Sequence, residues 1–99
     1  MKMTTELIQI RETGADDKKK YIAVFSIDGE PKTVKFGAKG YEDYTIHHDQ
    51  TRRDSYRKRH QHDNLSNPTS PGALSYYILW GDSTNIRTNI RNFITHFNL

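Results

Sequence analysis

The stretch KYIAVFSIDGEPKTVKF, residues 20–36, decides the fold that we expect for this chain. Its first half, residues 20–27, alternates like a β-strand and is largely apolar on both faces, which is typical of a central strand. The Asp28–Gly29 pair that follows indicates a tight hairpin, because such turns need residues with positive φ. Residues 32–36 then alternate again, so the stretch predicts two antiparallel strands.

A further strand is expected on the N-terminal side of this hairpin. Residues 5–12, TELIQIRE, show a short alternation that should place Ile8 and Ile10 on one face. A polar turn over residues 14–20 connects this segment to the hairpin. The simplest outcome over residues 5–36 is an antiparallel sheet of two or three strands.

The middle of the chain changes character after the last strand. Residues 37–49 contain two glycines and two tyrosines without a helical period, and we expect an ordered loop there. Asp49 is a suitable N-cap for a helix over residues 50–62, although that segment has almost no apolar face. Its one apolar pairing at helical spacing joins Tyr56 and His60.

Two more helices are expected in the last third of the chain. Ser70 and Pro71 are a good helix start and precede a helix over residues 72–80. Ser83 is the expected cap of the last helix, residues 84–97. That helix has the clearest amphipathic pattern in the sequence, formed by Ile86, Ile90, Phe93, Ile94 and Phe97.

Together these elements predict a single α+β domain over residues 1–99. It has a β-rich part at 5–36, an ordered loop at 37–49 and a helical part at 50–97, with the small N-terminal sheet packed against about three C-terminal helices. Only 33% of the residues are hydrophobic, which indicates a thin core and favours a surface for a partner.

Composition also argues against several classes of protein. The chain has no cysteine, which excludes disulfides, Cys-ligated zinc and a thiol nucleophile. It has no apolar run near the ~18 residues of a membrane span, and its beginning, MKMTTELIQIRE, lacks the apolar stretch of a secretory signal. No serine lies in a G-x-S-x-G motif. We therefore expect a protein that is not secreted, with no catalytic residue and no cofactor.

Positive charge is concentrated in residues 52–59, RRDSYRKR, where five basic residues stand against one acidic residue. A basic helix of this kind binds phosphates or an acidic protein partner, and its tyrosine can stack on a base. The candidate binding residues are Arg52, Arg53, Tyr56, Arg57, Lys58, Arg59 and, outside this segment, Lys39. In the alternative, a solvated helix, the arginines pair with Asp43, Asp49, Asp54 and Asp63.

Lys39 lies between Gly37 and Gly40, where backbone N–H groups can cradle a phosphate. The spacing is not that of a P-loop, so a tight chain reversal is the alternative.

The adjacent pair His47 and His48 offers imidazoles to a metal, and a β region followed by a helix faintly resembles the layout of ββα-metal nucleases. Adjacent histidines do not easily face one ion, so we predict no metal site and keep this pair as the only candidate ligands.

Three aromatic residues near each other, Tyr76, Tyr77 and Trp80, are candidates for an interaction surface. A place in the hydrophobic core is the alternative for Trp80.

Residues 32–97 resemble a family of small uncharacterised proteins encoded by large nucleocytoplasmic DNA viruses. The resemblance is carried by Lys35–Tyr41, Asp43–His47, Asp49, Arg53, Tyr56, Arg59, His60, Gly72–Ser75 and Ile78–Trp80. It implies a viral protein found in the virion or the infected-cell cytoplasm. It further implies that several of these residues work as a set. Physically, such a set can define the fold, with the loop folded over the helix, Thr45 or Asp49 as a cap, and His60 hydrogen-bonded inside.

Three functions follow, in order of preference. The first is a non-enzymatic virion structural component, of the minor capsid or cement type, whose partners are capsid or other virion proteins. The second is a nucleic-acid-binding protein that contacts DNA through residues 52–59. The third is a metal-dependent nuclease that uses the histidine pair.

Overall fold

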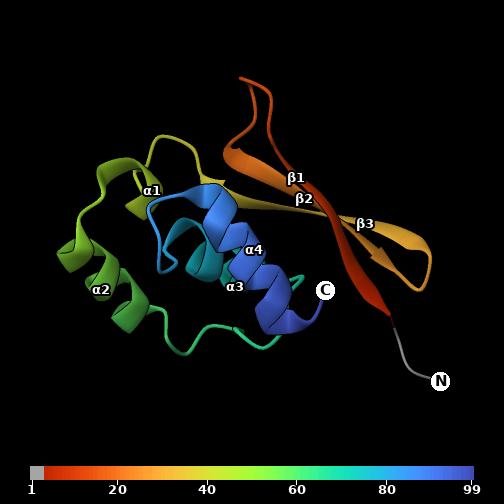
Figure 1. The fold of residues 1–99 in the computed structure, drawn as a ribbon. Coiled ribbons are helices and arrows are strands. Elements are labelled where there is room, and N and C mark those ends of the chain that lie inside the picture. The colour runs from red at the N-terminus through yellow and green to blue at the C-terminus, as the bar shows by residue number, and fades with distance from the viewer. Residues whose placement is uncertain (1–3) are drawn as a thin grey trace.

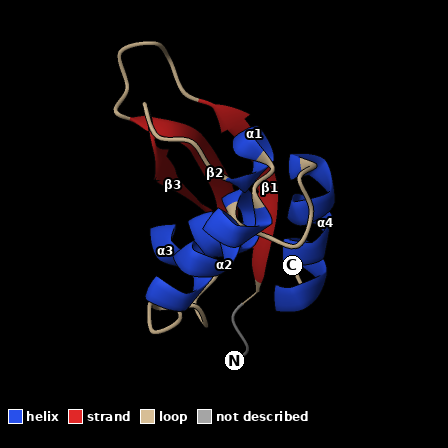
Figure 2. Cartoon of the chain, turned by 90° about the vertical axis from the view of Figure 1, so that its left-hand side faces the viewer, coloured by secondary structure: helices blue, strands red, loops and turns tan. Residues whose placement is uncertain are grey.

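The computed structural model describes residues 4–99 and has the α+β fold that the sequence predicts; the first three residues of the expected domain lie outside the described part. The sheet consists of β1 (Thr5–Glu12), β2 (Lys19–Ile27) and β3 (Glu30–Ala38). The strands are antiparallel in the order β1-β2-β3, so β2 is the central strand as expected. The helices lie on one side of this sheet (Figures 1 and 2).

The helical part follows the sheet along the chain. It consists of α1 (Tyr44–His47), α2 (Gln50–Arg59), α3 (Pro71–Leu74), η1 (Ser75–Leu79) and α4 (Ile86–Phe97). Ser70 caps α3 as predicted, its hydroxyl accepting from the Ala73 N–H. Within the helix predicted over 72–80, however, the chain widens into the π-helix η1, in which the Trp80 N–H donates to the Ser75 carbonyl at 3.0 Å.

Two other helix predictions need correction. The expected loop over 37–49 contains α1, a single turn that is too short to give a helical period in the sequence. The Asp43 side chain caps this turn by accepting from the Thr45 N–H at 2.9 Å. The helix α2 ends at Arg59, before the predicted residue 62.

The last helix begins slightly later than expected. Its N-cap is Asn85 and not Ser83, because the Asn85 side chain accepts from the N–H groups of Arg87 and Thr88 at 2.9 and 3.3 Å. Ser83 supports the cap from outside the helix, since its hydroxyl accepts from the Asn85 N–H at 3.0 Å. The amphipathic pattern of α4 is confirmed, with Phe93 buried on the inner face.

A bulge in β1 corrects the predicted facing of two isoleucines. The pairing register of β1 with β2 shifts between Leu7 and Gln9, which leaves Ile8 as an extra residue. Leu7 and Ile10 therefore both pack against the core, whereas Ile8 is 57% exposed. The expectation that Ile8 and Ile10 share a face was wrong, because a bulge changes the two-residue period.

The core lies between the inner face of the sheet and the helices η1 and α4. Phe25 and Phe36 from the sheet and Ile78 from η1 are fully buried. Gly37 lets β3 approach η1 closely, because a Cβ there would stand 2.8 Å from the Leu79 Cδ1 atom. No helix in residues 4–99 is long and apolar enough to cross a membrane.

Candidate functional site

The helix α2 has no buried residue, and two arginines four positions apart attach it to the rest of the domain. The Arg57 Nη1 donates to the Trp80 carbonyl at 2.8 Å, and the Arg53 Nε donates to the Gly81 carbonyl at 2.6 Å. Both carbonyls lie where η1 ends, and helix ends leave carbonyl groups without helical partners. Two of the five basic residues predicted to bind a partner therefore bind this chain itself.

Further contacts of the same two arginines fix their side chains. The Arg53 guanidinium also reaches Asp82 at 2.7 Å and Asp54 at 3.1 Å, and the side chain is only 14% exposed. The Arg57 guanidinium lies over the Tyr76 ring, 4.1 Å from its centre. We call the contacts of Arg53 and Arg57 with the end of η1 the arginine clamp.

An aromatic stack stands beside the arginine clamp. The Tyr56 ring lies parallel to Trp80, with 4.2 Å between ring centres and 6° between planes, and it also stacks on His60 at 4.2 Å. His47 packs against Trp80 at 5.3 Å. Burial, with a contribution from the Asp63 carboxylate, raises the pKa of Tyr56 to about 12. The predicted pairing of Tyr56 with His60 is therefore confirmed, as part of a larger cluster.

A buried ion pair holds the loop before α2 against the sheet. The Asp43 side chain is 2% exposed and accepts from the Lys20 Nζ at 2.8 Å. The same carboxylate accepts from both the backbone N–H and the hydroxyl of Thr45. Because each oxygen of Asp43 has a partner, the charge is compensated, and the pair serves to position α1.

Between the end of β3, the loop before α1, α2 and η1 lies a concave surface of about 360 Å³, which we call the α2 groove. Its aromatic and cationic lining consists of Tyr41, Tyr56, His60, Trp80, Lys20, Arg52 and Arg59. Two carboxylates, Glu42 and Asp43, line the same groove. A second, smaller hollow of about 280 Å³ shares three residues with it: Arg52, Arg59 and Trp80.

The side chains around the groove differ in how many contacts they make within the protein and in how exposed they are. Arg52 pairs with Glu42 at 3.2 Å, but the two side chains are 53% and 57% exposed. Arg59 has no ion-pair or hydrogen-bond partner among residues 4–99. Tyr41 is 74% exposed. The groove thus has a fixed base, made by the stack and the Lys20 pair, and an open rim.

The acidic residues named as alternative partners of the basic segment are mostly engaged elsewhere. Of the four residues named, Asp54 alone pairs with an arginine of α2 in the described part of the chain. Asp49 caps α2 as predicted, accepting from two backbone N–H groups of its first turn. Asp63 lies 2.8 Å from the Nδ1 atom of His60. The expected hydrogen bond of His60 is thus present, but its side chain is 38% exposed, so the expectation that it lies inside the fold was wrong.

The adjacent histidines face different neighbours. The His47 Nδ1 accepts from the Asp49 N–H at 2.9 Å, and its Nε2 atom is buried without a hydrogen-bond partner. His48 adopts a positive φ of 55° and its Nε2 lies 3.2 Å from the Thr45 carbonyl. In residues 4–99 no group of three histidine, aspartate or glutamate side chains is placed to hold a metal ion.

Lys39 lies apart from the basic residues of α2. Its Nζ donates to the Gly14 carbonyl at 2.6 Å, and its backbone N–H donates to the Lys18 carbonyl at 2.9 Å. Both contacts tie it to the turn between β1 and β2. Gly40, just after β3, has a φ of 90°, as a tight chain reversal requires, whereas Gly37 has its φ of 78° within β3.

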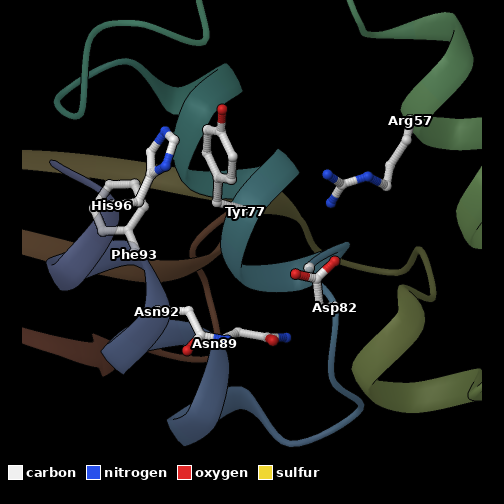
Figure 3. A pocket seen from close by; sticks show the side chains of 8 residues that line it. Arg57, Tyr77, Asp82, Asn89, Asn92, Phe93 and His96 are labelled. Atoms are coloured by element: carbon white, nitrogen blue, oxygen red, sulfur yellow. The ribbon is translucent and has the colours of Figure 1, made fainter.

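A separate cavity of about 220 Å³ lies on the other side of η1 (Figure 3). It lies between the arginine clamp and α4, and its lining includes Arg57, Tyr77, Asp82, Asn89 and Phe93. Tyr77, predicted as an interaction residue, packs against the aromatic rings of Phe93, His96 and Phe97. Of the three aromatic candidates, only Trp80 lines the α2 groove.

Sequence reasoning missed Asn89, which connects η1 to α4. Its side chain is 1% exposed and donates to the carbonyls of Ile78 and Ser83 at 2.9 and 2.7 Å. Its Oδ1 accepts from the Ser83 N–H at 3.0 Å. A polar residue on the inner side of an amphipathic helix was the available signal, because a buried amide needs partners.

The structure thus defines a small α+β domain in which the arginine clamp holds α2 in place. Aromatic and cationic side chains line the α2 groove beside this helix. Residues 15–60 are similar to the Family of unknown function (DUF5754). The similarity covers the strands β2 and β3, the buried Lys20–Asp43 pair and the whole of α2. No curated protein and no solved structure matches the chain.

Proposed function

We propose that the protein is a non-enzymatic binding module that works through protein–protein contacts made by the α2 groove. The observation that supports this proposal is the gathering of Tyr41, Trp80, Arg52 and Arg59 on one concave surface. Tyrosine, tryptophan and arginine are the residue types that most often anchor protein interfaces. The arginine clamp holds one wall of the groove in place, which lowers the entropic cost of binding.

We further propose a viral setting, on the basis of the resemblance of residues 32–97 to small proteins of large nucleocytoplasmic DNA viruses. In that setting the protein is a virion component of the minor capsid or cement type. Its partners are capsid or other virion proteins, and it acts in the virion or the infected-cell cytoplasm. A contact that depends on buried aromatic area suits such a role, because it survives changes in salt.

Calorimetric titration against the major capsid protein of a virus that encodes this chain tests the proposal. We expect a discrete complex that persists at several hundred millimolar salt and is weakened at least about tenfold by Tyr41→Ala. Arg91→Ala, on the exposed face of α4, is the matched control and should leave the affinity unchanged. Affinity that is insensitive to Tyr41→Ala contradicts the assignment of the groove as the contact surface.

Nucleic-acid binding through residues 52–59 is the second candidate, and the exposure of Arg52, Lys58 and Arg59 on α2 favours it. The arginine clamp weakens it, because Arg53 and Arg57 are engaged inside the protein. This candidate predicts affinity for a generic DNA duplex that falls steeply with salt, with a slope set by about three phosphates. A flat salt dependence contradicts it.

A further inference from the structure

The rim of the α2 groove holds groups whose interactions are incomplete. Arg59 has no ion-pair or hydrogen-bond partner in the described part of the chain, and the Arg52–Glu42 pair is largely in water, where such pairs contribute little. Tyr41 presents most of its ring to solvent. A partner that supplies carboxylates to the arginines and an apolar side chain to the aromatic rings would complete all of these contacts.

The positions of the two arginines set the spacing of the missing carboxylates. Arg52 and Arg59 are seven residues apart on α2, which corresponds to about 10 Å along the helix axis. Three residues of an extended polyproline-type segment span about 9 Å and bring the first and fourth side chains to the same side. Trp80 lines the two hollows that these arginines share, so the middle of such a segment meets its ring.

The acidic residues of the groove indicate that its partner is a protein segment and not a nucleic acid. Glu42 and Asp43 line the same surface as Arg52 and Arg59. A nucleic-acid strand carries a negative charge on every nucleotide and would meet the exposed Glu42 carboxylate at close range. A protein segment that is charged only at its two ends confines this repulsion to the one carboxylate that binds Arg52, where it takes the place of Glu42.

We propose that the α2 groove binds an extended acidic segment of a protein partner. The segment has two carboxylates three residues apart, one for Arg52 and one for Arg59, and a large apolar side chain between them that contacts Trp80 and Tyr41. This inference rests on the proposed protein–protein function and adds the chemistry of the segment that the partner presents.

The single tryptophan of the chain reports on this site directly. Trp80 fluorescence is followed while a blocked peptide, Gly-Asp-Phe-Pro-Asp-Gly, is added to the full-length protein. We expect a saturable change in emission, and binding at least about tenfold weaker for the peptide with both Asp replaced by Asn. Arg59→Gln should weaken the acidic peptide to a similar extent and Arg91→Gln should not.

The outcomes separate this inference from the broader function. Because Arg59 contacts no other group through ion pairs or hydrogen bonds in residues 4–99, Arg59→Gln should keep the circular dichroism and melting temperature of the parent protein. Equal binding of the Asp and Asn peptides, or tighter binding of an oligothymidylate, overturns the inference. If the peptide fails while the capsid protein still binds in a Tyr41-dependent way, the acidic segment is rejected and the protein–protein function is kept. If both fail, both proposals are rejected.

Discussion

Two regions of this molecule are attached to the rest of the domain by different kinds of interaction. The helix α4 presents an apolar face to the core, and Phe93 on that face is 1% exposed. The helix α2 buries no residue and depends on the arginine clamp and the Tyr56 stack. Apolar burial is non-directional and scales with area, whereas the clamp requires two guanidinium groups to meet two particular carbonyls.

Under the proposed function, this difference gives the two regions different roles. The core between the sheet, η1 and α4 gives the domain its stability. The helix α2 forms a wall of the groove with charged side chains, and a wall of this kind offers arginines to a partner without an exposed apolar helix face. Variants in the core should therefore lower the free energy of unfolding of the whole domain, whereas variants in the arginine clamp should lower only the local protection of α2.

The largest effect is expected from the core. Phe36 is fully buried and stacks on Tyr21 at 5.7 Å between ring centres, so Phe36→Ala removes a large apolar volume. We expect a loss of about 3–5 kcal/mol in the free energy of unfolding, measured by urea denaturation. Ile46→Ala, at a side chain that is 54% exposed, is the control and should change stability by less than about 0.5 kcal/mol. A loss below about 1 kcal/mol for Phe36→Ala would contradict the core described above.

A smaller loss in the free energy of unfolding of the whole domain is expected at Asn89, the buried polar residue of the same region. Asn89→Ala removes the side-chain donor from the buried Ile78 carbonyl and from the part-buried Ser83 carbonyl, which should cost about 2–3 kcal/mol of unfolding free energy. Asn92→Ala, an exposed change on the same helix, is the matched comparison. Equal melting temperatures for the two variants would show that the amide of Asn89 does not connect η1 to α4.

The sequence predicts the elements that follow a regular local pattern well and the departures from such a pattern poorly. Period-two alternation, the Asp28–Gly29 turn and the apolar spacing of α4 are local signals, and each is confirmed. The bulge at Ile8 breaks the period by one residue, and such an insertion leaves no mark in composition. The single turn α1 and the π-helix η1 are likewise set by packing and by capping rather than by periodicity.

The groove was only partly visible in the sequence for a physical reason. Arg52, Arg59 and Trp80 were named as candidates and lie together. The same basic pattern includes Arg53 and Arg57, which bind carbonyls at the end of η1, some two dozen residues away in sequence. An arginine that binds a partner and one that binds a distant carbonyl have the same local sequence, so only the fold separates them. Lys20 was not named at all, because its partner Asp43 is supplied by tertiary contact.

A local effect is expected when the clamp is removed. The double variant Arg53→Gln, Arg57→Gln should release α2 while the sheet and α4 stay folded, because α2 has no buried residue. Hydrogen–deuterium exchange should show lost protection over residues 50–59 and unchanged protection in β2 and β3. The double variant Lys58→Gln, Arg59→Gln has the same change in charge and should keep that protection. Simultaneous loss over the whole domain would show that α2 is part of the cooperative core.

The smallest effect at neutral pH, and the most specific probe of the stack, is the ionisation of Tyr56. Its pKa is raised to about 12, whereas the unfolded chain has an ordinary tyrosine value of about 10. A group whose folded pKa lies above its unfolded pKa contributes stability that is fully present below pH ~10 and is lost as the pH rises toward ~12. Ultraviolet absorbance of tyrosinate should therefore show a late-titrating component that Tyr56→Phe removes.

The pKa of this late-titrating tyrosine should also shift in a predictable direction when a charged neighbour of Tyr56 is replaced. Asp63 raises the pKa of Tyr56, so Asp63→Asn should move the transition to lower pH, whereas Asp54→Asn should leave it in place. The shift should be smaller than the contribution of burial, which is the main cause. Exchange protection of α2 should fall over the same pH interval, because a phenolate has to leave the face of Trp80 to reach water. If α2 keeps its protection after Tyr56 has ionised, the arginine clamp alone holds the helix, and the stack contributes only to the shape of the groove.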